Sequence, residues 1–258
     1  MSYWKERMAR AQQTLADKKI KQIERQLQRY YSRTAANIIK EFEATYDKIL
    51  LTVEAGKTPT PADLYKLDKY WQMQSQLRQE LNKLGEKQIA LLTKQFELQF
   101  FDVYFSIALV GEPTYNSIDK EIVTQMINQI WVADGKSWSQ RIWDNTELLQ
   151  QTLNDGLIDC VVTGKKTSDL KKILQQQFNV GYNRADSLVR TEVAHIQTEA
   201  AKKRYQDYGV QEVEVFVDED ERTCPVCAKY EGKRYLVTDK MPVPFHPRCR
   251  CCMLPVVD

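Results

Sequence analysis

Apolar residues recur at three- and four-residue steps along the first fifty positions of the chain, which is the period of one face of an α-helix. This stripe comprises Ile20, Ile23, Leu27, Tyr30, Thr34, Ile38, Phe42, Thr45 and Ile49. The pattern predicts one long helix from about Ser2 to Val53. Because a lone hairpin cannot bury so long a stripe, we expect the arm to associate with partner proteins or with further copies of the chain.

A second helical pattern starts at Thr60, which suits a helix N-cap, with Pro61 at the first helical position. It continues to about Val110, so the first two helices are expected to form an antiparallel hairpin. Shorter helices are predicted at 117–132, 139–162 and 168–178. A further helix is predicted from Asn183, as its cap, to Tyr208, with Gly209 just after its end.

After Gly209 the apolar period changes from helical steps to alternation. Val213, Val215 and Val217 alternate with Glu212, Glu214 and Phe216, which is the pattern of a strand with one buried face. The segment from Lys233 to Val237 is a plausible partner strand. The C-terminal part is therefore predicted to be a helix followed by a small β element.

The last thirty-five residues hold five of the six cysteines and one of the two histidines. A Cys-x-x-Cys turn, Cys224 to Cys227, supplies two ligands for a tetrahedral zinc ion, and His246 supplies a third. Cys249 is favoured as the fourth ligand and Cys251 is the alternative, while Cys252 is expected to be a packed thiol. Disulfides are the competing interpretation, but the charged N-terminal segment lacks the apolar core of a secretory signal, and a reducing cytoplasm keeps thiols free for metal.

These patterns together predict a mainly α fold. A long N-terminal helical hairpin (residues 1–110) and a helical middle region (111–181) precede a small α+β zinc-binding module (182–258). The most apolar window, Phe100 to Val110, is too short to span a membrane and contains Asp102, so no membrane association is expected.

Basic residues mark the side of the first helix opposite the apolar stripe. Lys21, Arg25, Arg29 and Arg33 recur at four-residue steps, although the whole chain carries a formal charge of only +2. A solvated helix face is the ordinary origin of such a pattern. The functional alternative is a surface for partners or for DNA, which would be bound without regard to base sequence.

Little in the chain predicts catalysis. A catalytic zinc needs an open coordination position and usually several histidines, whereas this chain has only His195 and His246. Glu192 and His195 form one Glu-x-x-His unit, but a di-iron site needs two. We expect His195 to be a buried helix residue, and Trp131, Trp138 and Trp143 to have packing roles. Zinc is accordingly expected to be structural.

A resemblance emerges from an ordered set of motifs. Its elements are Arg190-Thr191-Glu192 on a helix, Gly209-Val210, a strand, Asp218 to Arg222, Thr223-Cys224-x-x-Cys227, Gly232, His246-Pro247-x-Cys249-Arg250-Cys251 and Pro255. From Tyr182 to Val257 the chain resembles the C-terminal domain of the phage minor head proteins, a head morphogenesis family typified by protein F of phage Mu. Arg190 and Glu192 point about 160° apart on a helix, so either the helix is packed between two layers or one of the two side chains is exposed. Ion pairs that brace the zinc module are the usual origin of such charges, so we expect both residues to be structural.

The resemblance implies a non-enzymatic minor capsid protein of the virion, made in the host cytoplasm. Such proteins act in procapsid assembly and contact the portal protein, scaffold or major capsid protein, and some bind DNA. The alternative function is a zinc-containing nucleic-acid-binding protein acting in the cell, with Lys233 and Arg234 as additional phosphate contacts.

Overall fold

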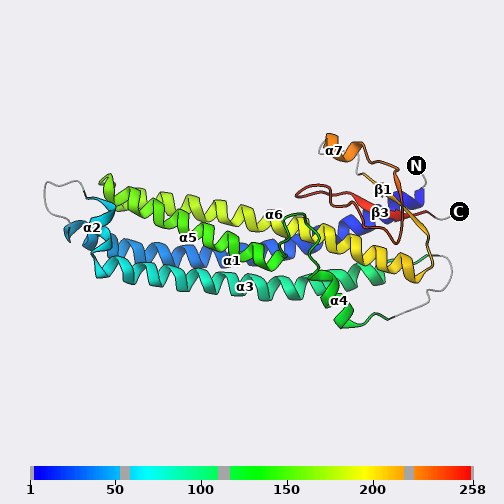
Figure 1. The fold of residues 1–258 in the computed structure, drawn as a ribbon, viewed down its shortest axis with the longest axis horizontal. Helices are drawn as coiled ribbons and strands as arrows, with labels where there is room; N and C mark the ends of the chain where they lie inside the picture. Colours follow the sequence, from blue (N-terminus) through cyan, green and yellow to red (C-terminus); the bar gives the residue numbers. More distant parts are fainter. Residues whose placement is uncertain (1–2, 53–58, 110–116, 218–223, 257–258) are drawn as a thin grey trace. The chain divides into compact units, whose positions relative to one another are not determined.

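The computed structural model describes residues 3–52, 59–109, 117–217 and 224–256 (Figure 1). Its helices are α1 (Tyr3–Thr52), α2 (Pro61–Tyr65), α3 (Asp68–Ser106), α4 (Lys120–Ile127), α5 (Trp138–Val162), α6 (Thr167–Asp207) and α7 (Pro225–Ala228). Its strands are β1 (Glu212–Phe216), β2 (Arg234–Leu236) and β3 (Cys252–Pro255). The prediction of a mainly helical chain with a small C-terminal β element is confirmed. No helix in the described ranges is both long enough and apolar enough to cross a membrane.

The chain forms two compact units, each assembled from separated segments. Unit 1 contains residues 1–24, 91–138 and 187–258, and unit 2 contains residues 25–90 and 139–186. The domain boundaries predicted from the sequence, after residues 110 and 181, divide the chain into consecutive segments. The compact units are not consecutive segments, because the long helices α1, α3 and α6 each contribute residues to both units.

Unit 2 contains the predicted hairpin. The amide of Asn37 on α1 donates to the carboxylate of Glu80 on α3 (3.1 Å), and the hydroxyl of Tyr31 donates to the side-chain oxygen of Gln88 (3.4 Å). The partner number rises as the α1 number falls, so the two helices are antiparallel. At the turn, the backbone N–H and the hydroxyl of Thr60 donate to Asp63 at 3.1 and 2.7 Å, which confirms Thr60 as the cap of α2.

The apolar stripe of α1 is buried within the chain itself. Ile23, Leu27 and Ile49 are completely buried, and Ile38 and Phe42 are nearly so. In unit 2, segments of α3, α5 and α6 lie beside this part of α1 (Figure 1). Most of the stripe is therefore core, whereas Tyr30 and Thr45 are half-buried and the neighbouring Tyr31 and Tyr46 are buried in their place. The buried stripe gives no support to the expectation that α1 recruits partners through an unburied apolar face.

The helix predicted from Asn183 was wrong in its start. One helix, α6, runs from Thr167 to Asp207 and absorbs the two separate helices expected from the sequence. Gly181 lies between the two expected helices and has a packing role. A Cβ there would lie 3.2 Å from Leu149 and 3.3 Å from Tyr31, so glycine permits a close approach in unit 2. The predicted end is confirmed, because Gly209 follows the helix with φ +73°.

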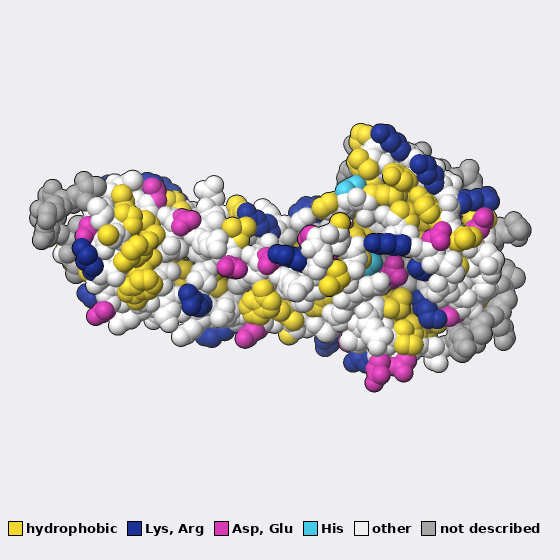
Figure 2. All heavy atoms as spheres, viewed as in Figure 1, with side chains coloured by type: hydrophobic (Ala, Val, Ile, Leu, Met, Phe, Trp, Pro, Cys, Tyr) yellow, Lys and Arg dark blue, Asp and Glu magenta, His cyan; other side chains and the backbone are white. Residues whose placement is uncertain are grey.

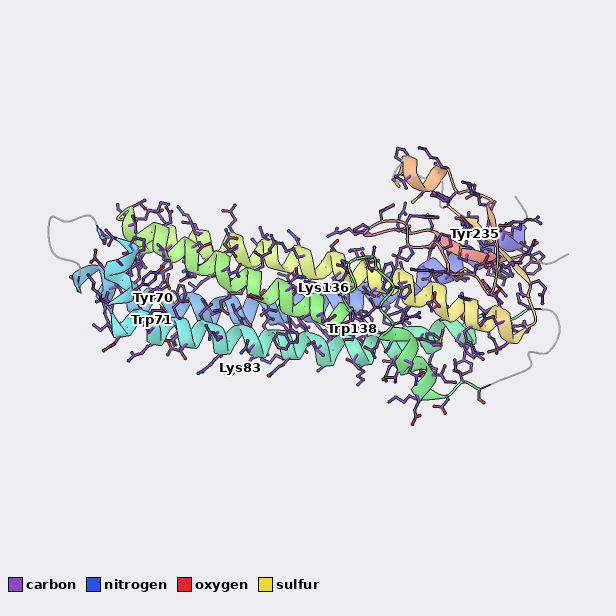
Figure 3. The ribbon with its side chains drawn as sticks, viewed as in Figure 1. Tyr70, Trp71, Lys83, Lys136, Trp138 and Tyr235 are labelled. Atoms are coloured by element: carbon purple, nitrogen blue, oxygen red, sulfur yellow. The ribbon has the colours of Figure 1, made fainter. Side chains whose placement is uncertain are left out.

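Aromatic side chains gather where α2 meets α3. Figure 3 shows Tyr70 and Trp71 in the first turn of α3, and the ring centroids of Tyr65 and Tyr70 are 5.5 Å apart. The Tyr70 hydroxyl donates to Asn154 on α5 at 2.8 Å, while the Trp71 indole donates to the Tyr65 carbonyl. This cluster holds α2 against the first turn of α3 within unit 2.

The sheet of unit 1 has the order β2-β1-β3, and both pairings are antiparallel. Strand β1 shows the predicted alternation of half-buried and buried residues, and β2 is the predicted partner strand. Strand β3 was not predicted, because all four of its residues are buried and no alternation marks it. Ala9 of α1 packs against Cys252 and Leu254 of β3, which confirms Cys252 as a packed thiol.

Candidate metal centre

The Cys-x-x-Cys segment forms the short helix α7. Cys224 is its N-cap, Pro225 occupies the first helical position, and the backbone N–H of Cys227 donates to the Cys224 sulfur at 3.3 Å. This local bond turns the sulfur of Cys224 toward the side of the helix on which Cys227 lies. The three-residue spacing thus brings two thiols together without any long-range contact.

His246 lies against both of these thiols. Its Nε2 is 3.1 Å from the sulfur of Cys224 and 3.1 Å from that of Cys227. The other ring nitrogen, Nδ1, is 2.8 Å from the carbonyl oxygen of Pro247. Donation from Nδ1 to this carbonyl leaves the Nε2 lone pair directed at the thiols, which is the tautomer that a metal ligand requires.

Two further thiols complete the cluster. The sulfur of Cys249 is 3.8 Å from that of Cys227, and the ligand atoms of Cys227, Cys249 and Cys251 all lie within 4.8 Å of one another. Cys227 belongs both to this group and to the group with Cys224 and His246. The structure therefore brings together all five donors named from the sequence and keeps both Cys249 and Cys251 close enough to serve.

The thiols perturb one another's pKa values. A hydrogen bond from Cys251 lowers the pKa of Cys249 to about 5, and the same bond raises the pKa of the donor, Cys251. The backbone N–H of Cys227 lowers the pKa of Cys224, whereas burial raises that of Cys227 to about 12. Crowded thiols cannot all ionise unless a cation compensates their charge, so this donor set suits a metal ion.

The spacing of the donors also suits a tetrahedral ion. Sulfur ligands about 2.3 Å from zinc lie about 3.8 Å apart along a tetrahedron edge, and Cys227 and Cys249 have this separation. The two sulfur-to-nitrogen distances of 3.1 Å are shorter than such an edge, so His246 would move outward slightly on binding. The cluster could hold a metal ion, and its soft donors favour zinc among the common divalent cations.

The Arg190-Thr191-Glu192 segment of α6 anchors this region in three directions. Arg190 forms an ion pair with Glu24 on α1. The Thr191 hydroxyl accepts a hydrogen bond from the backbone N–H of Arg248, at 3.1 Å, in the loop that carries Cys249. Glu192, which is 2% exposed, accepts from the indole of Trp131 at 3.1 Å. Each residue thus holds α6 against a different part of unit 1.

His195 lies one turn beyond Glu192 and is buried, as predicted. Its ring stacks on Trp131 with a centroid distance of 4.3 Å. Burial, together with the nearby Lys240, lowers the pKa of His195 to about 3, so the ring is neutral at ordinary pH. Trp131 therefore packs and hydrogen-bonds within the unit, as expected of the tryptophans. Trp138 does so too, because its buried indole donates to the Ile127 carbonyl.

The basic positions on α1 are exposed, as their spacing predicted. They are Lys21, Arg25, Arg29 and Arg33. Arg234 on β2 forms an ion pair with Glu212 at 3.5 Å, and the Lys233 ammonium lies 4.4 Å from the ring centre of Tyr230. On the face shown in Figure 2, basic and acidic side chains are interspersed, without a large region of one sign.

Three comparisons with known proteins bear on this arrangement. Residues 151–254 match the model of a family described as Phage Mu protein F like protein. The resemblance read from the motifs is thereby confirmed, and the match begins about thirty residues earlier than Tyr182, within α5. The match supports the interpretation that the chain resembles a phage head morphogenesis family. The matched residues include all five clustered thiol and imidazole donors. Searches of the curated proteins and of the solved structures gave no significant match.

Arg190 and Arg250 were named from the sequence only as members of family motifs, and it was not predicted that they line a cavity with Arg248. Arg248 and Arg250 alternate with the cysteines in the segment 246–251, and together with Arg190 they line a cavity in unit 1. The available signal was this alternation of arginine and cysteine. The position of Arg190 beside the same cavity depends on tertiary packing and left no mark in the local sequence.

Proposed function

We propose that the protein is a non-enzymatic minor capsid protein that acts in assembly of a phage head. The family match across residues 151–254 carries this proposal, because it spans the metal cluster, the Arg190-Thr191-Glu192 segment and the sheet. The partners expected from the resemblance are the portal protein, the scaffold or the major capsid protein. The protein would then be part of the virion, within the capsid or near the portal.

The metal ion that we propose is a structural zinc. Cys224, Cys227 and His246 would be three of its ligands. Cys249 is the preferred fourth ligand, because its sulfur lies at a tetrahedral edge distance from Cys227 and its low pKa favours the thiolate. Cys251, which donates to Cys249, is the alternative. Four protein ligands close the coordination sphere, which is the arrangement of structural zinc sites.

The absence of an enzymatic role is also part of the proposal. A closed zinc site offers no position for a substrate or an activated water. The other histidine, His195, is 6% exposed, stacked on Trp131 and neutral at ordinary pH. It lacks the access to solvent that a general acid or base needs.

A second candidate function is a zinc-containing protein that binds nucleic acid in the cell. The four exposed basic residues of α1 favour it. They would contact phosphates without reading base sequence. The two functions predict different locations for the protein, since only a component of the phage head should remain with purified particles.

Co-purification from induced or infected cells tests the proposal. The tagged full-length protein is expected to isolate with the portal protein and to remain in purified heads. Cys224→Ser should lose incorporation because it removes a metal ligand, whereas the matched variant Cys252→Ala, which alters a packed thiol, should retain it. Heads that lack the wild-type protein, although it is expressed and folded, would overturn the assignment.

A further inference from the structure

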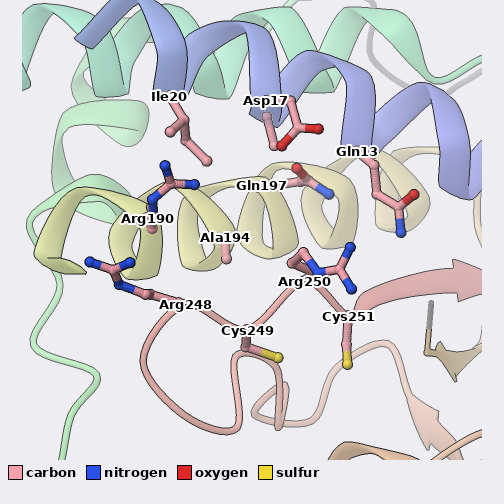
Figure 4. A pocket seen from close by; sticks show the side chains of 11 residues that line it. Gln13, Asp17, Ile20, Arg190, Ala194, Gln197, Arg248, Cys249, Arg250 and Cys251 are labelled. Carbon is pink, nitrogen blue, oxygen red and sulfur yellow. The ribbon is translucent and has the colours of Figure 1, made fainter. Parts of the chain in front are cut away.

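A cavity of about 330 Å³ lies in unit 1 between α1, α6 and the loop that carries two of the candidate metal ligands (Figure 4). Its lining comprises Gln13, Ala16, Asp17, Ile20, Arg190, Ala194, Gln197, Arg248, Cys249, Arg250 and Cys251. We call it the arginine cavity. Its volume is in the range of sites that bind small organic ligands.

The walls of the arginine cavity are regular structure. Gln13, Asp17 and Ile20 follow one another at four and three residues, which places them on one face of α1. Arg190, Ala194 and Gln197 have the same spacing on α6. Two walls of the cavity are therefore helical, and the loop of residues 248–251 forms the rest of the lining.

The loop that closes the cavity is also fixed. The backbone of Arg248 has φ +63°, an uncommon conformation for a residue other than glycine, and its N–H is bound by the Thr191 hydroxyl at 3.1 Å. On the opposite wall, the ion pair with Glu24 holds the side chain of Arg190. The side chain of Arg190 and the backbone of Arg248 are thus held in place by neighbouring residues.

The charge of the lining is positive. Three guanidinium groups face one carboxylate, that of Asp17, and Asp17 is exposed on α1. Because Glu24 already compensates Arg190, the excess of positive charge comes from Arg248 and Arg250, and it attracts a phosphate monoester, whose charge is about −2 near neutral pH. Arginine is also the side chain best suited to bind phosphate through paired N–H donors.

Two amide atoms beside the cavity lack protein partners. The Oε1 atom of Gln197 and the Nε2 atom of Gln13 are buried, and no described group hydrogen-bonds to them. Gln197 as a whole is 5% exposed. Leaving buried polar atoms unpaired costs free energy, so a turn of either amide toward the cavity would be favoured by a polar ligand that pairs with it.

We propose that the arginine cavity binds a phosphate monoester on an organic body about as large as a nucleotide. Arg190, Arg248 and Arg250 bind the phosphate, and the amides of Gln13 and Gln197 contact the attached body. An isolated phosphate ion would leave most of the volume empty. A free nucleotide and a phosphorylated end of a nucleic-acid strand are the two sources of this group.

Calorimetric titration of the full-length, zinc-loaded protein tests the site. The probes are inorganic phosphate, deoxyadenosine 5′-monophosphate, and one oligothymidylate with and without a 5′-phosphate. The monophosphate should bind more tightly than inorganic phosphate. Binding of the oligonucleotide only when it carries the 5′-phosphate would identify a strand end as the source, and binding of the mononucleotide alone would identify a free nucleotide.

Variants separate this site from general charge. Arg250→Gln should weaken monophosphate binding about tenfold or more, because a charged hydrogen-bond donor is lost. Ala194→Leu keeps every charge but fills the cavity and should abolish binding. Arg25→Gln, on the exposed face of α1, is the control and should bind as the wild type does. Circular dichroism and zinc content verify that each variant is folded.

Two results would overturn the proposal. One is a wild-type protein that binds none of the four probes. The other is a folded Ala194→Leu variant whose affinity for the monophosphate equals that of the wild type, since the ligand would then lie elsewhere. The second test holds even if Arg250→Gln disturbs the neighbouring cysteines, because Ala194 lies on α6 and not in the metal-binding loop.

Discussion

Gln12 on α1 donates a hydrogen bond to the hydroxyl of Tyr205 on α6, at 3.0 Å, and both side chains are buried. The same hydroxyl donates to the carbonyl of Met253 on β3 at 3.1 Å. One phenol therefore joins the start of the chain, the longest C-terminal helix and the last strand. The first turns of α1 belong to the folded unit that carries the metal cluster.

Tyr205→Phe should destabilise this unit by about 1–3 kcal/mol, because it leaves Gln12 and the Met253 carbonyl buried without their partner. Urea unfolding of the full-length protein, followed by circular dichroism, measures the change. Tyr235→Phe on β2 removes the same atom from a half-buried ring and is the matched control. Equal stability of the two variants would show that the buried bond contributes nothing.

Removal of residues 1–24 should unfold unit 1. These residues include Ala9, which packs on Cys252 and Leu254, and Lys5, which forms an ion pair with Glu214 at 2.5 Å. An arm that served only to associate with partners could be deleted while the C-terminal unit stayed folded. Limited proteolysis decides between these expectations: a protected fragment from β1 to β3 in the truncated protein would mean that the unit is independent after all.

The metal cluster should contain about one zinc ion per chain. Cys227→Ser should abolish zinc binding and unfold the small β element, because structural zinc contributes on the order of 10 kcal/mol to folding of such modules. Elemental analysis of the purified protein and its circular dichroism before and after chelation measure both effects. Intact thiols with no zinc, in a protein that remains folded, would contradict this prediction.

Cys252→Ala is the control for the zinc measurement. Cys252 is 1% exposed and packs against Ala9, and it is not among the clustered donors. Its replacement should keep the zinc content and cost about 1 kcal/mol through the small cavity that it leaves. A loss of zinc in this variant would mean that Cys252 takes the place of Cys249 or Cys251 as a ligand.

The sequence predicted what short-range patterns encode. The stripe of α1, the cap at Thr60 and the alternation in β1 each depend on residues that are close along the chain, and each was confirmed. The clustering of Cys224 and Cys227 was predicted for the same reason, because their spacing is itself that of a local turn. Strand β3 was missed because all four of its residues are buried, so it lacks the alternation of apolar and polar residues that identifies a strand.

Long-range contacts left no such signal. Arg190 is paired with Glu24, which lies 166 positions earlier, and no periodicity links the two residues. The opposed directions of Arg190 and Glu192 predicted a helix packed between two layers or one exposed side chain. Only the structure identifies Glu24 and Trp131 as the two neighbours. The continuity of α6 through Gly181 likewise depends on the close approach of Leu149 and Tyr31.

Stability should depend on pH through His195. Its folded pKa, about 3, lies below the unfolded value of about 6.5, so the unfolded chain takes up a proton that the folded protein excludes. Its contribution is therefore present above pH 6.5 and lost as the pH falls toward 3. Between pH 7.5 and 5.5 this loss is about 1.4 kcal/mol. His195→Phe, which can still stack on Trp131, should remove this part of the dependence in urea unfolding, and an unchanged dependence would contradict it.

DNA binding, if it uses the exposed basic residues of α1, should be independent of sequence and sensitive to salt. Neutralising about four phosphates gives a log–log salt slope near −3.5, so a fourfold rise in salt should weaken binding about a hundredfold. Changing Lys21, Arg25, Arg29 and Arg33 to Gln should flatten this slope while preserving helicity, because Gln has a similar helix propensity.

Fluorescence anisotropy with duplex DNA at several salt concentrations measures the slope. A slope that survives the quadruple change would mean that these side chains are a solvated face and that any DNA contact lies elsewhere. Lys165, Lys166, Lys171 and Lys172 would be the next residues to change, although Lys165 and Lys171 already form ion pairs with Asp159 and Glu43.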